Sequence, residues 1–453
     1  MGLGLERRLG PLDGAAIVVS NVIGSGIFLV PAIVAAAVPH PGWMLLLWVL
    51  GGALAFAGAM AYAELAALRP RAGGEYVYLR EAFGPAIAFL TGWTSFVAGF
   101  SGAIAVSAVG LAGYLGRFLP AAADTTPLAT VALGPLTVGL SPQRIVALSA
   151  IAGLTAVHVI GLGPGRFVQN LLAGIKVSLL VIFVALGFTL GRGAGVQPEV
   201  VVGSVAVSSW LLALLPVMFA YSGWNAAAYL AEEMRDPGRN VPLALGLGTS
   251  VVIAIYILLN LLFLHAMSIG DMADALGGYV SDVAAERLFG PAVAVPIAAA
   301  FVVMIAASIS AMVFAGPRVY FAMAQDGQFP AAAGVVHKRF RTPATAIVAQ
   351  SLWACVLVLT GTFQQLVNYT AFAVVLFSGV AVGALFVLRW RDPSEPRPFR
   401  AWGYPLAPFV FLVATLAMVM NSIWREPVPS TAGLALIAAG MPVYYLFVRS
   451  RED

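Results

Sequence analysis

The sequence predicts an all-α membrane protein with twelve transmembrane helices. Of its 453 residues, 61% are hydrophobic and 10% are charged, whereas an average soluble domain has about 45–50% apolar and about 25% charged residues. The apolar residues form runs of about 20, the length that crosses a bilayer as a helix. Most loops between these runs are too short to fold independently. A soluble enzyme is therefore excluded, and one membrane domain occupies residues 1–453.

The spans follow from the apolar runs, and twelve of them place both termini on the same side of the membrane. Short cytoplasmic loops collect Lys and Arg. With a cytoplasmic N-terminus, 18 of the 24 basic residues lie inside and five outside, with Lys176 within a span, so both termini are expected in the cytoplasm. The expected spans are 12–37, 42–67, 84–116, 143–162, 167–190, 204–232, 241–268, 292–323, 342–361, 365–389, 404–424 and 430–448.

The positions and spacing of the charged and reactive residues argue against several classes of protein. The net charge is +4, but the basic residues are spread between the apolar runs, so nucleic acid is a poor partner. Neither an HExxH motif, nor paired intramembrane carboxylates, nor a nucleophile and base at useful spacing is present. The four histidines do not have metal-ligand spacing. We therefore expect no enzyme activity, no metal and no cofactor.

Two spans carry glycine interruptions at mid-depth. The first reads PLDGAAIVVSNVIGSGIFLVP, and its half from Leu12 to Gly24 is about 19 Å long at 1.5 Å per residue, which ends near the bilayer centre. The sixth reads LLALLPVMFAYSGWNAAAYLAEE, with a similar interruption from Phe219 to Gly223. Paired interruptions at corresponding positions are typical of inverted-repeat transporters, whose binding sites are built from broken helices.

Such breaks expose backbone groups that suit a zwitterion. Free N–H groups at a positive helix end bind a carboxylate; here they are those of Ser25, Gly26 and Ile27. Free carbonyls accept from an ammonium group; the candidates are those of Val22, Phe219, Ala220 and Ser222. An α-amino acid carries both groups at the right separation. The alternative for either break alone is a close helix crossing through small residues.

Three motifs resemble the amino acid, polyamine and organocation transporter superfamily, and within it a bacterial member of the L-type amino-acid transporter branch. They are IGSGIF at 23–28, PRAGGEYVYLREAFGP at 70–85 and FAYSGWNAAAYLAEEMRDPGRNVPLAL at 219–245. The resemblance implies a LeuT-type fold with discontinuous helices 1 and 6. Its two inverted five-span repeats would lie at about 12–190 and 204–389, and its peripheral helices at about 404–448.

The resemblance also implies where substrate binds. The backbone of the substrate would contact Val22, Gly24, Ser25, Gly26, Phe219 and Ser222. Phe219 would cover the substrate from outside as a thin gate. Position 222 departs from the family, because relatives commonly have a second glycine there; the Ser222 hydroxyl would narrow the pocket and favour small or polar side chains.

Lys176 is the one basic residue inside a span, and such a residue is a functional hypothesis by default. It lies about 14 Å along the fifth span from Phe167. In the family resembled here, a lysine of this span stands in for the cation of sodium-coupled carriers. Its ammonium would donate to carbonyls near Gly24 and to a hydroxyl of the eighth span, either Ser308 or Ser310. It would act as a fixed tether or as a proton carrier.

The substrate class follows by elimination. Nothing acidic lies at mid-depth in spans three, six, eight or ten, so cationic substrates would have no buried partner. Lys176 would be committed elsewhere, which disfavours acidic ones. We expect a sodium-independent carrier of neutral L-amino acids in a bacterial plasma membrane. It would work as an exchanger or, alternatively, as a proton symporter or exporter; an ethanolamine carrier or a channel ranks lower.

An accessory subunit is not expected. Animal members of the branch pair with a single-span glycoprotein through a cysteine in an outer loop. The corresponding loop, around 117–142, has none, and the single cysteine, Cys355, lies in an apolar run. The lipid bilayer and the small-molecule substrate are the only partners we predict.

Overall fold

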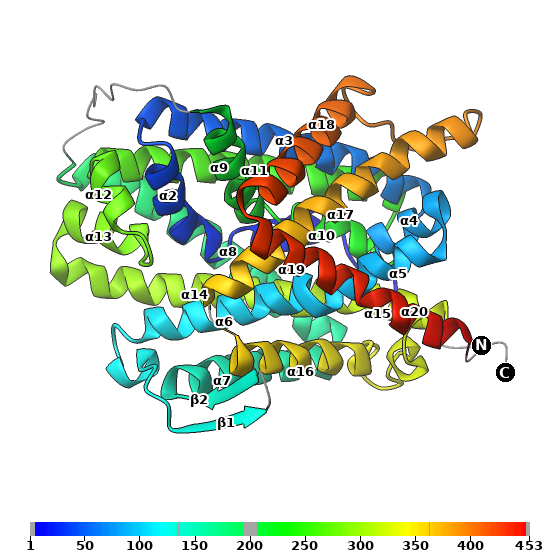
Figure 1. The fold of residues 1–453 in the computed structure, drawn as a ribbon, viewed down its shortest axis with the longest axis horizontal. Helices are drawn as coiled ribbons and strands as arrows, with labels where there is room; N and C mark the ends of the chain where they lie inside the picture. The colour runs from blue at the N-terminus through cyan, green and yellow to red at the C-terminus, as the bar shows by residue number, and fades with distance from the viewer. Residues whose placement is uncertain (1–4, 134–135, 194–205, 362, 450–453) are drawn as a thin grey trace.

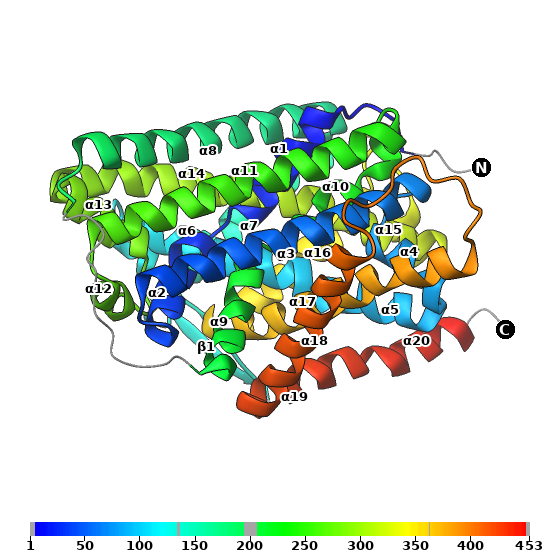
Figure 2. The same cartoon turned by 90° about the horizontal axis from the view of Figure 1, so that it is seen from above.

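The computed structural model describes residues 5–133, 136–193, 206–361 and 363–449, which form an elongated bundle of helices (Figure 1). The long helices α3, α11, α14 and α8 run alongside one another through the molecule (Figure 2). The described chain enters the bundle at α1 and leaves it at α20, and both lead to the same end of the molecule.

The first half of the chain contains the elements up to α8. Prolines open α1, α3, α5 and α7, where a fixed φ and a missing N–H are tolerated. The helices are α1 (Pro11–Val22), α2 (Gly26–Ala37), α3 (Pro41–Leu68), α4 (Glu75–Phe83), α5 (Pro85–Thr94), α6 (Phe100–Leu115), α7 (Pro142–Ile160) and α8 (Leu162–Leu190). A π-helical turn, Ser95–Gly99, joins α5 to α6, and a 3-10 turn spans Pro120–Ala123.

The second half contains the remaining helices, with 3-10 turns at Ala231–Glu233 and Ala331–Gly334. Several are short, because glycine and proline interrupt the apolar runs. They are α9 (Val207–Ala220), α10 (Ala226–Tyr229), α11 (Pro237–Ala266), α12 (Ile269–Asp274), α13 (Val280–Phe289), α14 (Pro291–Ala315), α15 (Pro317–Gln325), α16 (Ala344–Thr360), α17 (Phe363–Arg391), α18 (Leu406–Arg425), α19 (Pro427–Ala438) and α20 (Gly440–Arg449).

The protein has the helices of a polytopic membrane protein. Within the described ranges, nine helical segments are long and apolar enough to cross a bilayer, and the bent pair α1 and α2 makes a tenth. The expected twelve spans add the shorter apolar helices α9 and α16 to these ten. Helix α9 is short because it ends at Ala220, three residues before Gly223. The count of twelve stays a prediction.

The structure adds one β-hairpin that the apolar pattern did not predict. Strands β1 (Ala129–Leu133) and β2 (Leu136–Leu140) pair antiparallel in the loop between α6 and α7. Both strands contain Val and Thr, whose branched side chains favour extended backbone. The hairpin lies at the edge of the bundle beside α7 (Figure 1), and it leaves the helical core unchanged.

The position of α1 determines where a site can form. This helix packs against α11, α8 and α14, so its end at Val22 lies inside the bundle rather than at the lipid surface. Most of its residues are buried, including the polar Ser20 and Asn21. A break in a helix so enclosed exposes its backbone to protein and to any cavity, not to hydrocarbon, which is the condition under which such a break is tolerated.

Candidate functional site

Two helices are interrupted inside the bundle, in the first and sixth predicted spans. Helix α1 ends at Val22 and α2 begins at Gly26, and the two halves are bent by 47°. Between them, Gly24 N–H donates to the Val22 carbonyl over 2.8 Å. Helix α9 ends at Ala220, and Gly223 takes a φ of +99° before α10 begins. Glycine is favoured there because other residues are strained at such a φ.

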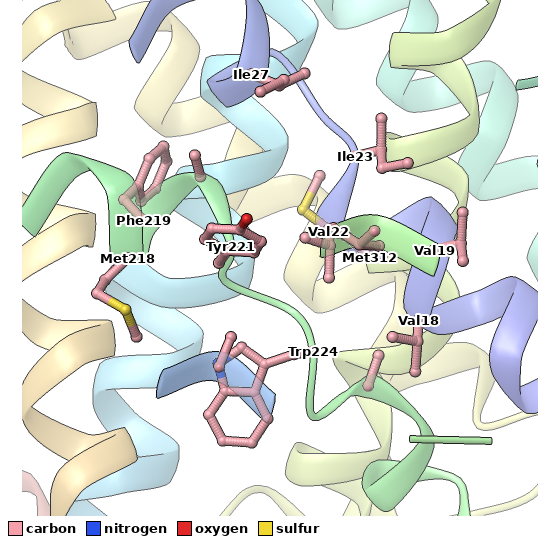
Figure 3. Packing of buried hydrophobic residues seen from close by; sticks show 14 of the residues in the cluster. Val18, Val19, Val22, Ile23, Ile27, Met218, Phe219, Tyr221, Trp224 and Met312 are labelled. Carbon is pink, nitrogen blue, oxygen red and sulfur yellow. The ribbon is translucent and has the colours of Figure 1, made fainter. Parts of the chain in front are cut away.

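The two breaks lie side by side. A Cβ built on Gly26 would stand 3.1 Å from the Cα of Ala220. The hydroxyl of Tyr256, a buried residue of α11, lies 2.9 Å from the Val22 carbonyl and 2.8 Å from the Ala220 carbonyl, so its single O–H bridges the two breaks. Figure 3 shows non-helical chain between Val22 and Ile27, and again between Tyr221 and Trp224, within the same region. Tyr256 was not predicted, because the sequence gives no reason to prefer one hydroxyl in an apolar span.

A cavity of about 100 Å³ opens between these breaks and helices α5, α6, α14 and α17. Seven of the eight predicted substrate-contacting residues line it: Val22, Gly24, Ser25, Gly26, Phe219, Ala220 and Ser222. Ile27 is not among the lining residues; its side chain is fully buried in the hydrophobic core. The first turn of α2 begins at this cavity, and its leading N–H groups have no acceptor within the helix.

Lys176 is fully buried in α8 and reaches the break in the first span. Its Nζ donates to the carbonyls of Ser20 and Ile23, over 3.0 and 2.5 Å, and to Ser308 Oγ over 2.7 Å. Ser308 Oγ also donates to the Ile23 carbonyl over 2.6 Å. The three N–H bonds of an ammonium group therefore each meet an oxygen, and α8, α1 and α14 are held together.

Of the two serines considered as partners for Lys176, the structure selects Ser308. Ser310 lies 2.7 Å from His158 Nε2 and donates to Gln169 Oε1 over 3.0 Å. Two residues along a helix point in directions about 200° apart, so both serines could not face Lys176. Ser310 instead links α14 to α7 and α8.

The sequence analysis missed a carboxyl group at the cavity. Glu75, the first residue of α4, lines it together with Asn225 and Tyr229; the expectation that nothing acidic lies at mid-depth in spans three, six, eight or ten did not consider this residue. Glu75 precedes the apolar run of the third span, so it is not among the residues expected at mid-depth. Two glycines before it were the available signal: Gly73 and Gly74 both have positive φ, and that turn brings the carboxyl inward.

Both ends of the cavity are covered by side chains. Phe219, which is 8% exposed, lines one side. Towards the end that holds α12 and α13, the Tyr114 and Tyr279 rings stack with centroids 4.0 Å apart. Beyond them Arg117 pairs with Asp282 over 3.1 Å. Burial raises the pKa of the Asp282 carboxyl, and the Arg117 guanidinium opposes that rise.

The opposite end is closed by a buried ion pair. Arg318 Nε lies 2.8 Å from Glu233 Oε1, and neither side chain is more than 1% exposed. The segment before α1 joins this closure, because Leu9 and Met234 form a parallel bridge. The Leu9 N–H also donates to the Glu233 carbonyl over 2.9 Å. We call these four residues the inner closure; it connects the ends of the first, sixth and eighth predicted spans.

Comparison with known proteins agrees with this architecture. The family model described as "Amino acid permease" matches residues 9–448. The large neutral amino acids transporter small subunit 2 of Mus musculus is 30% identical over 459 residues, covering 99% of this chain and 82% of the relative. The serine/threonine exchanger SteT of Bacillus subtilis is 31% identical over 444 residues, covering 98% and 97%. The human b(0,+)-type amino acid transporter 1 is 29% identical over 454 residues, covering 98% and 88%.

These relatives are transporters rather than enzymes, and each match extends over almost the whole of this chain. The family model likewise includes both interrupted helices and the helices that surround the cavity. The chain therefore belongs to the amino acid permease family of membrane transporters.

Proposed function

We propose that the protein is a sodium-independent carrier that exchanges neutral L-amino acids by alternating access. The observation that carries this proposal is the pairing of two helix breaks at one cavity. The leading N–H groups of α2 suit the substrate carboxylate, and the carbonyls at the ends of α1 and α9 suit its ammonium group. The Ala220 carbonyl keeps a lone pair besides the one used by Tyr256, whereas the Val22 carbonyl already accepts from both Tyr256 and the Gly24 N–H.

Exchange is preferred over net transport because of the bacterial relative, whose name describes a serine/threonine exchanger. Neutral substrates are favoured by the name of the mouse relative. The cavity supports small or polar side chains, because Ser107, Ser222 and Ser378 line it. Proton symport or export of the same substrates is the alternative. An amine without a carboxylate, such as ethanolamine, would leave the N–H groups of α2 unpaired.

The proposed architecture is the twelve-span LeuT type. Its inverted repeats would occupy about 12–190 and 204–389, with peripheral helices at about 404–448. The interruption of α1–α2 and that of α9–α10 fall in the first span of each repeat, which supports this arrangement. Phe219 would be the outer thin gate, since it belongs to α9 and lines the cavity.

Sodium independence rests on Lys176. Its ammonium occupies the space between α1 and α14 with a fixed positive charge, and it bonds the Ile23 carbonyl and Ser308 Oγ. A sodium ion would need those same oxygens and would be repelled by the charge. The complete set of acceptors around Nζ favours a fixed tether over a proton carrier.

We place the protein in the bacterial plasma membrane, with both termini in the cytoplasm. The surplus of basic residues in the loops of that side supports the orientation. We propose that it works without a disulfide-linked subunit, since its one cysteine, Cys355, is a half-buried residue of α16.

Counter-flow in proteoliposomes tests the function. Vesicles loaded with one unlabelled amino acid should accumulate a trace of labelled serine, threonine or alanine transiently, with sodium absent on both sides. A panel of unlabelled amino acids in the lumen defines the substrates. Accumulation that requires sodium, or flux without counter-flow as in a channel, would contradict the proposal.

A further inference from the structure

Glu75 is a buried acid at the substrate cavity that no part of the proposed exchange cycle uses. It is 8% exposed and lines the end of the cavity nearer the inner closure, as do Asn225 and Tyr229. Asn225 follows the break after α9 and precedes α10. The carboxyl therefore touches both the cavity and the half of the sixth span that leads to the inner closure.

The groups around Glu75 are hydrogen-bond donors without charge. Tyr62 OH donates to Glu75 Oε2 over 2.7 Å, and Asn225 Nδ2 donates to the same oxygen over 3.3 Å. Asn225 also donates to Tyr229 OH over 2.9 Å, and Tyr229 hydrogen-bonds the carboxyl. Tyr78 of the same helix and Tyr320 of α15 complete the surroundings.

Positive charges on the neighbouring elements are engaged elsewhere. Among the described residues, no arginine or lysine lies within ion-pair distance of Glu75. On α4, Arg80 pairs with Asp326 over 2.5 Å. On α17, Arg389 pairs with Glu64, and Arg391 bonds carbonyls at the far end of α4. Helix α5 has no charged residue. Burial is the main effect on the carboxyl and raises its pKa.

Lys176 presents the opposite case. Its three N–H bonds each meet an oxygen, so its charged form is fully satisfied and removal of a proton would cost a bond. The Glu75 carboxylate has donors but no cation, so its neutral form is accessible. Of the two ionisable groups at the breaks and the cavity, Glu75 is the one that lines the cavity itself.

We propose that Glu75 is the proton-binding group of the transport cycle and that its protonation releases the inner half of the sixth span. A proton from cytoplasmic water forms an O–H bond on a carboxylate oxygen, and the same bond breaks when the proton returns to water. The protonated carboxyl holds Asn225 and Tyr62 less tightly, because hydrogen bonds to a charged acceptor are the stronger ones. The inner side then opens more readily. This inference rests on the proposed carrier function.

The test is the pH dependence of counter-flow, with equal pH on both sides, from about pH 5 to about pH 8. The wild-type rate should rise at least about threefold as pH falls, with a midpoint above the ordinary Glu value of about 4.3. Glu75→Gln should be flat across this range, at a rate near the acidic limit of the wild type. Glu81→Gln is the matched control: Glu81 lies on the same helix but pairs with Arg69 and does not line the cavity, so its profile should be that of the wild type.

A second variant keeps the proposal testable if Glu75→Gln fails to fold. Asn225→Asp puts a second carboxyl beside the first, and two such groups cannot both ionise readily. The midpoint should therefore move to higher pH by about one unit or more. An unmoved midpoint would overturn the proposal.

Other results would also overturn it. These are a pH-independent wild type, a Glu75→Gln variant that keeps the wild-type profile, and a loss in that variant confined to basic substrates, which would make Glu75 a side-chain subsite. A wild type with no counter-flow but pH-dependent net uptake would refute exchange and leave the role of Glu75 in place. The two failures are thus distinguishable.

Discussion

The ammonium of Lys176 holds the inner half of the first span in place, and its loss should slow transport. Its Nζ bonds the Ser20 and Ile23 carbonyls and Ser308 Oγ, and a hydrogen bond to a charged group contributes about 1.5–3 kcal/mol. Lys176→Ala should lower the initial rate of counter-flow at least about tenfold, because α1 loses its attachment to α8 at the break.

Lys338, the only other lysine of the chain, provides the control. It is exposed in a loop outside the bundle, so Lys338→Ala should transport at the wild-type rate. Size-exclusion profiles of both variants separate lost folding from lost transport. A folded Lys176→Ala protein with wild-type rates would show that the tether is dispensable.

At this scale, the sequence reveals a residue when its type is unusual for its surroundings. Lys176 is conspicuous as a cation near the middle of a span, and its hydroxyl partner could be narrowed to Ser308 or Ser310. Glu75 and Tyr256 could not be found in this way. The first lies outside the apolar run, and its place at the cavity depends on a glycine turn. The second is a tyrosine in an apolar helix, and the sequence does not show which way its side chain points.

The two broken helices form one element of function, and their contact should not tolerate an added methyl group. A Cβ at Gly26 would lie 3.1 Å from Ala220 Cα and 3.3 Å from its Cβ. Overpacking of this kind costs about 1–3 kcal/mol, and here it would push the first turn of α2 away from α9. Gly26→Ala should weaken the apparent affinity for substrate about tenfold, as measured by competition in counter-flow.

Gly153 of α7 is the matched position, since a Cβ there meets nothing within 4 Å. Gly153→Ala should keep the wild-type affinity and should be as stable as the wild type, or slightly more, because alanine is the better helix former. Equal affinities for the wild type and Gly26→Ala would mean that the contact between the breaks does not shape the substrate site.

The interruption of a helix was predictable where the residue composition alone breaks it. The Gly-Ser-Gly run at 24–26 interrupts the first span within a residue of the expected place. The β1–β2 hairpin and the π-helical turn at Ser95–Gly99 were not predicted. The hairpin is two short segments in a loop, and the π-helical turn keeps the apolar content of an ordinary helix, so neither changes the pattern from which spans are inferred.

At the scale of the whole molecule, the inner closure joins distant parts of the chain. Leu9 before α1, Met234 after α10 and Arg318 at the start of α15 meet within it. These contacts join residues that are far apart in the sequence. The charged residues near the sixth span could therefore be noticed, but their partners could not be predicted. In the proposed carrier, the closure would come apart whenever the cavity opens to the side of the termini. Its strength would then set the balance between closed and inward-open molecules.

Weakening the closure should shift that balance. Removing one partner of a buried ion pair costs about 3–5 kcal/mol, and about 1.4 kcal/mol already changes a population tenfold.

In a Cys355→Ser background, a cysteine at Thr94, which lines the cavity, reports access from the side of the termini by its alkylation rate. Glu233→Gln should raise that rate at least about tenfold and lower the Tm, because Arg318 loses its charged partner. Glu232→Gln should change neither quantity, since Glu232 accepts only from a backbone N–H and lies outside the pair. If Glu233→Gln leaves both the alkylation rate and the Tm unchanged, the buried pair does not hold the inner side closed.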